Sequence, residues 1–145
     1  TIRLMAGGTT VDQVLTIVVD PRVIAQGTSL QDIDEQVAMQ LVLIDMLSEV
    51  RQFQQTVENE QADLEKRSND LRPDEAERLL LVMDVLNEVK DAEIIYPRPM
   101  LARQISFLHN MISGADQAPG VEAADRLTEL SATLADLKAR YAGEN

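Results

Sequence analysis

LQDIDEQVAMQLVLIDMLSEVRQFQQTVENEQADL, residues 30–64, is the stretch that decides the fold. It contains no Gly and no Pro, and its apolar residues recur at steps of mostly three and four, the spacing of one helix face. The residues expected to face inward are Leu30, Ile33, Val37, Leu41, Ile44, Leu47, Val50, Phe53, Val57 and Leu64, with Val42, Leu43 and Met46 widening the stripe. We therefore predict one long amphipathic helix against which the rest of the chain folds.

The two ends of this helix differ. Thr28 followed by Gln31 fits a capping box, and acidic residues fill the first turns, where the helix dipole favours negative charge. After Val57 the apolar stripe thins to Leu64 alone. We expect the C-terminal end of the helix to project or fray.

Three further helices are expected, over residues 73–91, 100–112 and 121–141. The first begins at Pro73, a residue that suits the first turn, and the last stops at Gly143. Residues 94–99 carry two prolines, which favour an extended connector. Short connections favour antiparallel neighbours. The predicted fold is mainly α, an up-and-down antiparallel bundle of four helices with one long first helix.

The first 26 residues have a different pattern. Residues 1–5 alternate in polarity and residues 14–19 are largely β-branched, so we predict a hairpin whose loose eight-residue loop contains Gly7 and Gly8. Asp20 and Pro21 are interpreted as the exit from the second strand. Two strands alone are marginal in water. We expect residues 1–26 to be the remnant of a preceding β-sandwich plus a linker, residues 27–145 to form the helical bundle, and the chain to be a fragment.

Composition limits the function classes. The chain has 145 residues, a formal net charge of -12 and a pI of about 4.4. Such an acidic chain repels phosphate backbones, which argues against a nucleic-acid partner. No apolar run is long enough for membrane insertion. There is no Cys and only four aromatic residues, so neither a disulfide scaffold nor an aromatic core is expected.

No catalytic constellation is visible, and we predict no catalytic, cofactor-binding or metal-ligating residue and no cofactor. His109 is the single histidine, and Ser106 stands where a diiron bundle would need Glu three residues before it. Asp116 is expected to cap its own turn, and the Asp20–Arg22 pair is too common a pattern to indicate a binding site. The carboxylates Glu58, Glu60 and Asp63 are interpreted as a solvated face.

Three segments together carry a family resemblance: VDPRV at residues 19–23, the helix over residues 34–49, and residues 101–119 with ISFL and GADQAP. They resemble the C-terminal region of large bacterial exported proteins with sortilin-like or BNR-repeat β-propellers, often labelled glycosyl hydrolase or sialidase-like. Gly120 departs from the Thr expected in that pattern. The resemblance implies an upstream β-propeller and β-sandwich and a periplasmic or extracellular location. Any catalytic residues would lie in the propeller, so none is transferred to this chain.

The hypothesis is a non-catalytic accessory or interaction domain of a larger exported protein, whose partners are its own upstream β-domains. One alternative is a homo-oligomeric scaffold, which requires exposed apolar residues around Val42, Leu43 and Met46. A less favoured alternative is a self-contained hydrolase, which requires facing carboxylates across a cleft.

Overall fold

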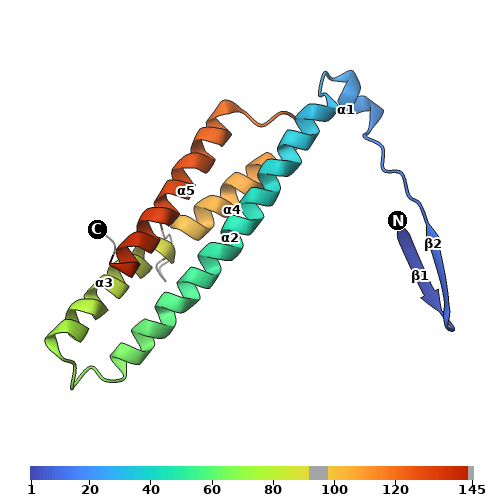
Figure 1. The fold of residues 1–145 in the computed structure, drawn as a ribbon. Coiled ribbons are helices and arrows are strands. Elements are labelled where there is room, and N and C mark those ends of the chain that lie inside the picture. Colours follow the sequence, from blue (N-terminus) through green and yellow to red (C-terminus); the bar gives the residue numbers. More distant parts are fainter. Residues whose placement is uncertain (92–97, 144–145) are drawn as a thin grey trace.

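The computed structural model describes residues 1–91 and 98–143, and this part of the chain contains two strands and five helices (Figure 1). The elements are β1 (Ile2–Ala6), β2 (Thr9–Gln13), α1 (Pro21–Ala25), α2 (Leu30–Glu65), α3 (Pro73–Val89), α4 (Leu101–Ile112) and α5 (Val121–Ala142). The mainly α class, the long first helix of the bundle and the preceding hairpin are confirmed.

The four main helices form three rods (Figure 1). Helices α3 and α4 follow one another along α2 and run opposite to it, while α5 returns in the direction of α2. Gln36 near the start of α2 donates to the carbonyl of Ile112 at the end of α4, and Asp91 just after α3 accepts from the backbone N–H of Met100 before α4. The bundle is thus antiparallel with a broken middle rod. The predicted connector lies, for residues 94–97, outside the described residues.

The core is built on a seven-residue repeat in α2. A repeat of this length keeps one seam facing the partner helices. The buried residues of α2 are Gln36, Leu43, Met46, Val50, Phe53, Val57 and Leu64. They pack with aliphatic residues from α3, α4 and α5, among them Val82, Val85, Ile105, Leu108, Leu130 and Leu137. The expectation of a largely aliphatic core is met, with Phe53 its aromatic member.

The predicted inward face of α2 is wrong over its N-terminal half. Leu41 is 57% exposed, whereas Leu43 is fully buried. Leu30, Val37 and Ile44 are exposed as well. The reason is that α4 and α5 pack on the face that carries Leu43, so the apolar residues on the opposite side of the helix remain in solvent.

The expected fraying of the C-terminal end of α2 is also wrong. Val57 and Leu64 are buried there. Residues 66–72 form a short turn that brings α3 directly back against this end of α2. A thin apolar stripe is therefore enough to keep the helix packed, since Val57 and Leu64 both belong to the common core of the bundle.

The second strand of the hairpin was predicted at the wrong place. Strand β2 begins at Thr9, directly after the two-residue turn of Gly7 and Gly8, and pairs with β1 so that Leu4 faces Val11. Both glycines have positive φ, 56° and 79°, as a type I′ turn requires. Residues 14–19 lie outside any strand because no neighbouring strand is there to pair with their β-branched sequence.

Asp20 and Pro21 begin a helix and do not end a strand. Asp20 accepts a hydrogen bond from the backbone N–H of Arg22 (2.8 Å), and Pro21 is the first residue of α1. The capping box of α2 is also one residue later than predicted. Ser29 and Asp32 form it, while the Thr28 hydroxyl donates to the backbone carbonyl of Asp116 (3.2 Å).

Candidate functional site

One partly buried polar cluster joins α2, α3 and α5. Glu60 accepts two hydrogen bonds from the Arg78 guanidinium (2.7 and 2.8 Å) and one from the Tyr141 hydroxyl. Arg78 also donates to the backbone carbonyl of Tyr141 (2.6 Å) and lies 4.4 Å from the centre of its ring. Phe53 meets that ring edge-on, with 5.5 Å between the centroids. We call these four residues the Glu60 clamp.

The electrostatics of the Glu60 clamp favour fixed charges. Hydrogen bonding from Arg78 holds the pKa of Glu60 below its ordinary value, against the opposing effect of burial. Burial, together with the hydrogen bond to Glu60, raises the pKa of Tyr141. Glu60 therefore stays ionised and Tyr141 protonated near neutral pH, so neither is poised for proton transfer there. The clamp acts as a tie between three helices.

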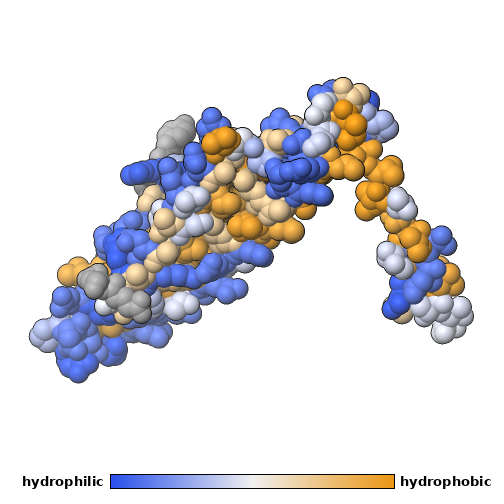
Figure 2. All heavy atoms as spheres, turned by 45° about the horizontal axis from the view of Figure 1, so that its top comes forward, coloured by the Kyte–Doolittle hydropathy of each residue, from blue (hydrophilic) through white to orange (hydrophobic). Residues whose placement is uncertain are grey.

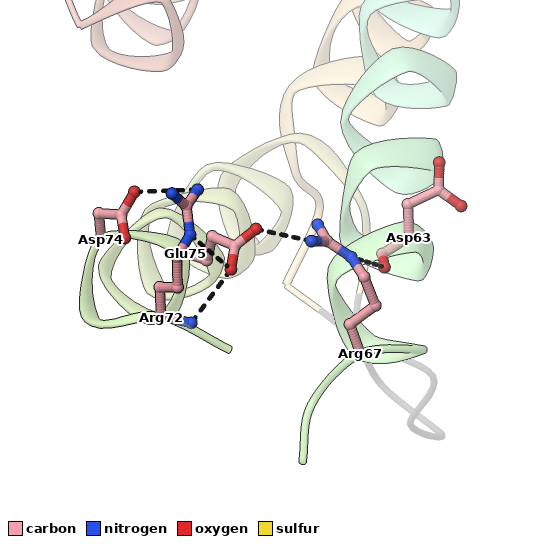
Figure 3. A network of polar contacts seen from close by, with 5 residues as sticks. All are labelled: Asp63, Arg67, Arg72, Asp74 and Glu75. Carbon is pink, nitrogen blue, oxygen red and sulfur yellow. Dashed lines mark hydrogen bonds and ion pairs between the residues drawn. The ribbon is translucent and has the colours of Figure 1, made fainter. Parts of the chain in front are cut away.

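A second polar network closes the turn between α2 and α3 (Figure 3). Glu75 accepts from the backbone N–H of Arg72 (3.0 Å), and it accepts from the guanidinium of Arg67 (2.6 Å) and from that of Arg72 (3.3 Å). Arg72 also pairs with Asp74 (3.3 Å), and Arg67 donates to the backbone carbonyl of Asp63 (3.5 Å). The backbone bond and the two guanidinium groups lower the pKa of Glu75 to about 2. This network caps α3 and holds the turn.

Two further ties fix the ends of α4. The Gln36 side chain, 3% exposed, donates to the carbonyls of Ile112 and Ala115 (both 2.5 Å), which the helix itself leaves unpaired. At the other end, Asp91 accepts from the backbone N–H of Met100 (2.7 Å) and pairs with Arg103. The Gln36 contacts position α4 on α2, and the Asp91 contacts join the end of α3 to the start of α4.

The hollows on the described surface are shallow. A groove of about 370 Å³ between α2 and α5 is lined by Val42, Met46 and Leu134, with Glu49 and Lys138 paired at its rim. A hollow of about 210 Å³ between α2 and α3 has a more polar wall. The wall of the second hollow contains Glu58 of α2 and Asp91, which follows α3. Both carboxylates are engaged in structural contacts, Glu58 with Gln54 and Lys90, and Asp91 with the backbone N–H of Met100 and with Arg103. The pair required by the hydrolase alternative would need one carboxyl free to donate a proton and the other free to act as base or nucleophile.

The carboxylates expected on a solvated face are partly engaged. Glu60 is half-buried in its clamp, and Glu58 accepts from Gln54 (3.0 Å) and pairs with Lys90 (3.2 Å). Asp63 is the exposed one of the three, and it pairs with Lys66 (2.9 Å). The interpretation as a purely solvated face is thus wrong for Glu60, because the opposing helices bring Arg78 and Tyr141 to it.

The other residues considered from sequence lie apart from one another. His109 is half-buried on α4, Asp116 lies in the exposed turn before α5, and Asp20 with Arg22 caps α1. The carboxylate of Asp116 makes no hydrogen bond with a described residue, so the prediction that it caps its own turn is wrong. The backbone carbonyl of Asp116 accepts from the Thr28 hydroxyl. The structure brings none of these residues together into a site.

The residues that hold the bundle were missed from sequence. Gln36 is a polar member of the buried repeat, and the half-buried Glu60 follows Met46 and Phe53 at the same seven-residue spacing. Their partners, which include the carbonyl of Ile112 and the Arg78 side chain, come from distant parts of the chain. The signal was present in the seven-residue repeat that runs from Gln36 to Leu64. A polar residue inside such a repeat indicates a buried polar tie.

Within residues 1–91 and 98–143 there is no group of three or more His, Asp or Glu side chains that could hold a metal ion. The helices of this part of the chain are all too short or too polar to cross a membrane. Comparison with protein-family models, with curated proteins and with solved structures finds no match.

Proposed function

We propose that this chain is a non-catalytic interaction module of a longer protein, joined through its N-terminal hairpin to a preceding β-domain. The observation that carries the proposal is the hairpin itself. All ten residues of β1 and β2 are exposed, and the segment extends away from the bundle (Figure 1). A hairpin that packs on nothing lacks the layer that would stabilise it.

The two faces of the hairpin differ in polarity. Ile2, Leu4 and Val11 lie on one face, because strand residues alternate and Leu4 pairs with Val11. On the other face Arg3 and Asp12 form a two-bond ion pair (2.8 and 2.8 Å). The first face is the more apolar, with Thr9 and Gln13 at its ends, and the second carries Met5 and Thr10 beside the ion pair. A mainly apolar face opposite a more polar one is the pattern of a strand pair that covers a second sheet, as in a β-sandwich.

The segment between the hairpin and α1 supports the same proposal. Val14, Leu15, Ile17 and Val18 are exposed, and in Figure 2 this arm is coloured as hydrophobic along most of its length. The whole chain exposes 10281 Å². A compact protein of 16.1 kDa exposes about 7,400 Å². The elongated bundle accounts for part of the difference, and the arm supplies apolar surface that a neighbouring domain would cover.

The resemblance to exported proteins with sortilin-like or BNR-repeat β-propellers identifies the neighbour in this proposal. The preceding domain would be a β-sandwich that follows a propeller, outside the cell membrane, and any glycoside chemistry would belong to the propeller. Residues 1–26 complete the preceding sheet, and residues 27–145 form the module that it carries. The proposal assigns no cofactor and no nucleic-acid partner to this chain.

Amide hydrogen exchange tests the proposal. In the chain by itself we expect rapid exchange over residues 2–13 and slow exchange in the buried parts of α2 and α5. In the longer protein the hairpin amides should become protected while those of the bundle stay as they are. Equal protection of the hairpin in both samples would contradict a role in docking to a preceding domain. Glycoside turnover by this chain, lost in Glu60→Gln, would favour the hydrolase alternative.

The scaffold alternative needs its own measurement. It required exposed residues around Val42, Leu43 and Met46, and of these Leu43 and Met46 are buried. Light scattering over a range of concentrations distinguishes the two. A mass that stays at 16.1 kDa favours the module. A stable dimer would favour the scaffold.

A further inference from the structure

The N-terminal half of α2 has a second apolar face. Its members, Leu30, Ile33, Val37, Leu41 and Ile44, follow one another at steps of three and four residues. At about 100° per residue they fall within an arc of about 80°, on the side of the helix that faces away from the buried repeat. We call these five residues the outer stripe.

The outer stripe is in solvent over most of its length. Leu30, Val37, Leu41 and Ile44 are 63%, 46%, 57% and 47% exposed, and Ile33 is half-buried. The stripe runs over residues 30–44, whose 14 helical steps of about 1.5 Å give a length of about 21 Å, or about four turns. Exposed apolar residues scattered singly need no explanation, but a continuous row on a rigid helix is typical of an interaction surface.

The charge beside the outer stripe has one sign. Residues 23–50 contain five carboxylates and no Lys or Arg. Asp34 and Asp45 lie along one edge of the stripe, and neither forms an ion pair within the described residues. The stripe ends where Arg51 takes the next position of its seven-residue spacing. An apolar row with an uncompensated acidic edge therefore faces any partner that approaches.

We propose that the outer stripe of α2 is the docking site for a cationic amphipathic helix of a partner protein. An apolar seam on that helix would cover Val37, Leu41 and Ile44, and its Lys or Arg side chains would meet Asp34 and Asp45. A second copy of this chain fits less well, since it would bring the same acidic edge and a net charge of -12 to the contact.

This inference rests on the proposed function, whose partner chemistry it names, but its test uses this chain alone. The probe is a labelled peptide of three heptads with Leu at the a and d positions and Lys elsewhere. Two control peptides replace Lys by Glu or scramble the order. Binding is followed by fluorescence anisotropy, first at about 150 mM salt and then at higher salt.

Matched variants distinguish binding at the outer stripe from nonspecific attraction of the peptide to the acidic chain. Leu41→Ser with Ile44→Ser alters the outer stripe, and Leu80→Ser with Met83→Ser alters two exposed apolar residues of α3. We expect the Lys peptide to bind at least about tenfold more tightly than either control peptide, and the stripe variant to lose about tenfold. The α3 variant should bind unchanged. Asp34→Asn with Asp45→Asn should lower the affinity for the Lys peptide and make that affinity less dependent on salt concentration.

Three results would overturn the inference. They are equal binding of the Lys and Glu peptides, equal binding by the stripe and α3 variants, and a concentration-dependent doubling of mass that the stripe variant abolishes. The last result would assign the stripe to a second copy. Failure here leaves the hairpin exchange test of the proposed function untouched, because the hairpin and the outer stripe share no residue.

Discussion

The two halves of α2 show how one helix can serve two purposes. The C-terminal half buries Val50, Phe53 and Val57 and is tied to α3 and α5 by the Glu60 clamp. The N-terminal half buries Leu43 and Met46 on one side and presents the outer stripe on the other. The comparison teaches that apolar spacing shows a face able to pack, and that the partner helices decide which face does so.

The largest expected effect lies in the C-terminal half. Phe53→Ala should lower the free energy of unfolding by about 3–5 kcal/mol, since it opens a cavity in the core and removes the edge contact with Tyr141. Urea unfolding followed by circular dichroism measures it. Leu30→Ala in the N-terminal half is the control and should change it by less than about 0.5 kcal/mol. If Phe53→Ala and Leu30→Ala lost similar free energy of unfolding, the core position in the C-terminal half would be no more important than the exposed one in the N-terminal half.

Gln36 provides the corresponding tie in the N-terminal half. Gln36→Ala should cost about 1–3 kcal/mol, because it leaves the carbonyls of Ile112 and Ala115 without their donor. The exposed Gln31→Ala is the matched control. In amide hydrogen exchange, the loss of protection in Gln36→Ala should appear first at the end of α4. If amide exchange became equally faster in α3, the two halves of α2 would not be stabilised separately.

Glu60→Gln should have a smaller effect of about 1–2 kcal/mol, because the variant keeps the shape of the side chain but loses the charge that faces Arg78. Exposed ion pairs contribute less than this, so Asp63→Asn, which breaks the pair with Lys66, is the control. Thermal melts compare the two. If Asp63→Asn costs as much as Glu60→Gln, the clamp is no stronger than a surface pair.

The smallest effect concerns pH. The folded protein lowers the pKa of Glu75 from 4.5 to about 2, so its contribution to stability is complete above about pH 4.5 and is lost as pH falls towards 2. The melting temperature of the native chain should therefore fall more between pH 5 and pH 3 than that of Glu75→Gln. Equal slopes would show that the network at the α2–α3 turn contributes nothing.

The existence and the approximate ends of α2, α3, α4 and α5 could be predicted from sequence, because local signals set them, whereas the short helix α1 was missed. The long helix was expected over residues 30–64 and runs over Leu30–Glu65, and Pro73 and Gly143 mark the ends of α3 and α5 as expected. These positions depend on backbone chemistry within one or two turns. No distant contact is needed to determine them.

The buried face of α2 could not be chosen from the same signals, because two apolar repeats share the N-terminal half of the helix. Leu30, Val37 and Ile44 are spaced by seven residues, as are Gln36, Leu43 and Val50. Only the second repeat continues to Leu64, whereas the first meets Arg51. Following each repeat along the whole helix would have favoured the correct face, although Gln36 argued against it locally.

The position of the second hairpin strand and the Glu60 clamp were missed for different reasons. The tight turn of Gly7 and Gly8 was treated as part of a longer loop, because residues 14–19 have the stronger β composition. The Glu60 clamp depends on Arg78 and Tyr141, which lie 18 and 81 residues away in the sequence. The seven-residue spacing indicates that Glu60 lies near the core, but no local pattern identifies partners that are so distant in the sequence.

One comparison tests the central claim that α2 buries one apolar face and leaves the other in solvent. Leu43→Ala and Leu41→Ala remove the same side-chain atoms two residues apart, from a fully buried and a 57% exposed position. In urea unfolding we expect Leu43→Ala to cost about 2–5 kcal/mol and Leu41→Ala less than about 0.5 kcal/mol. Equal losses, or a larger loss for Leu41→Ala, would contradict the account.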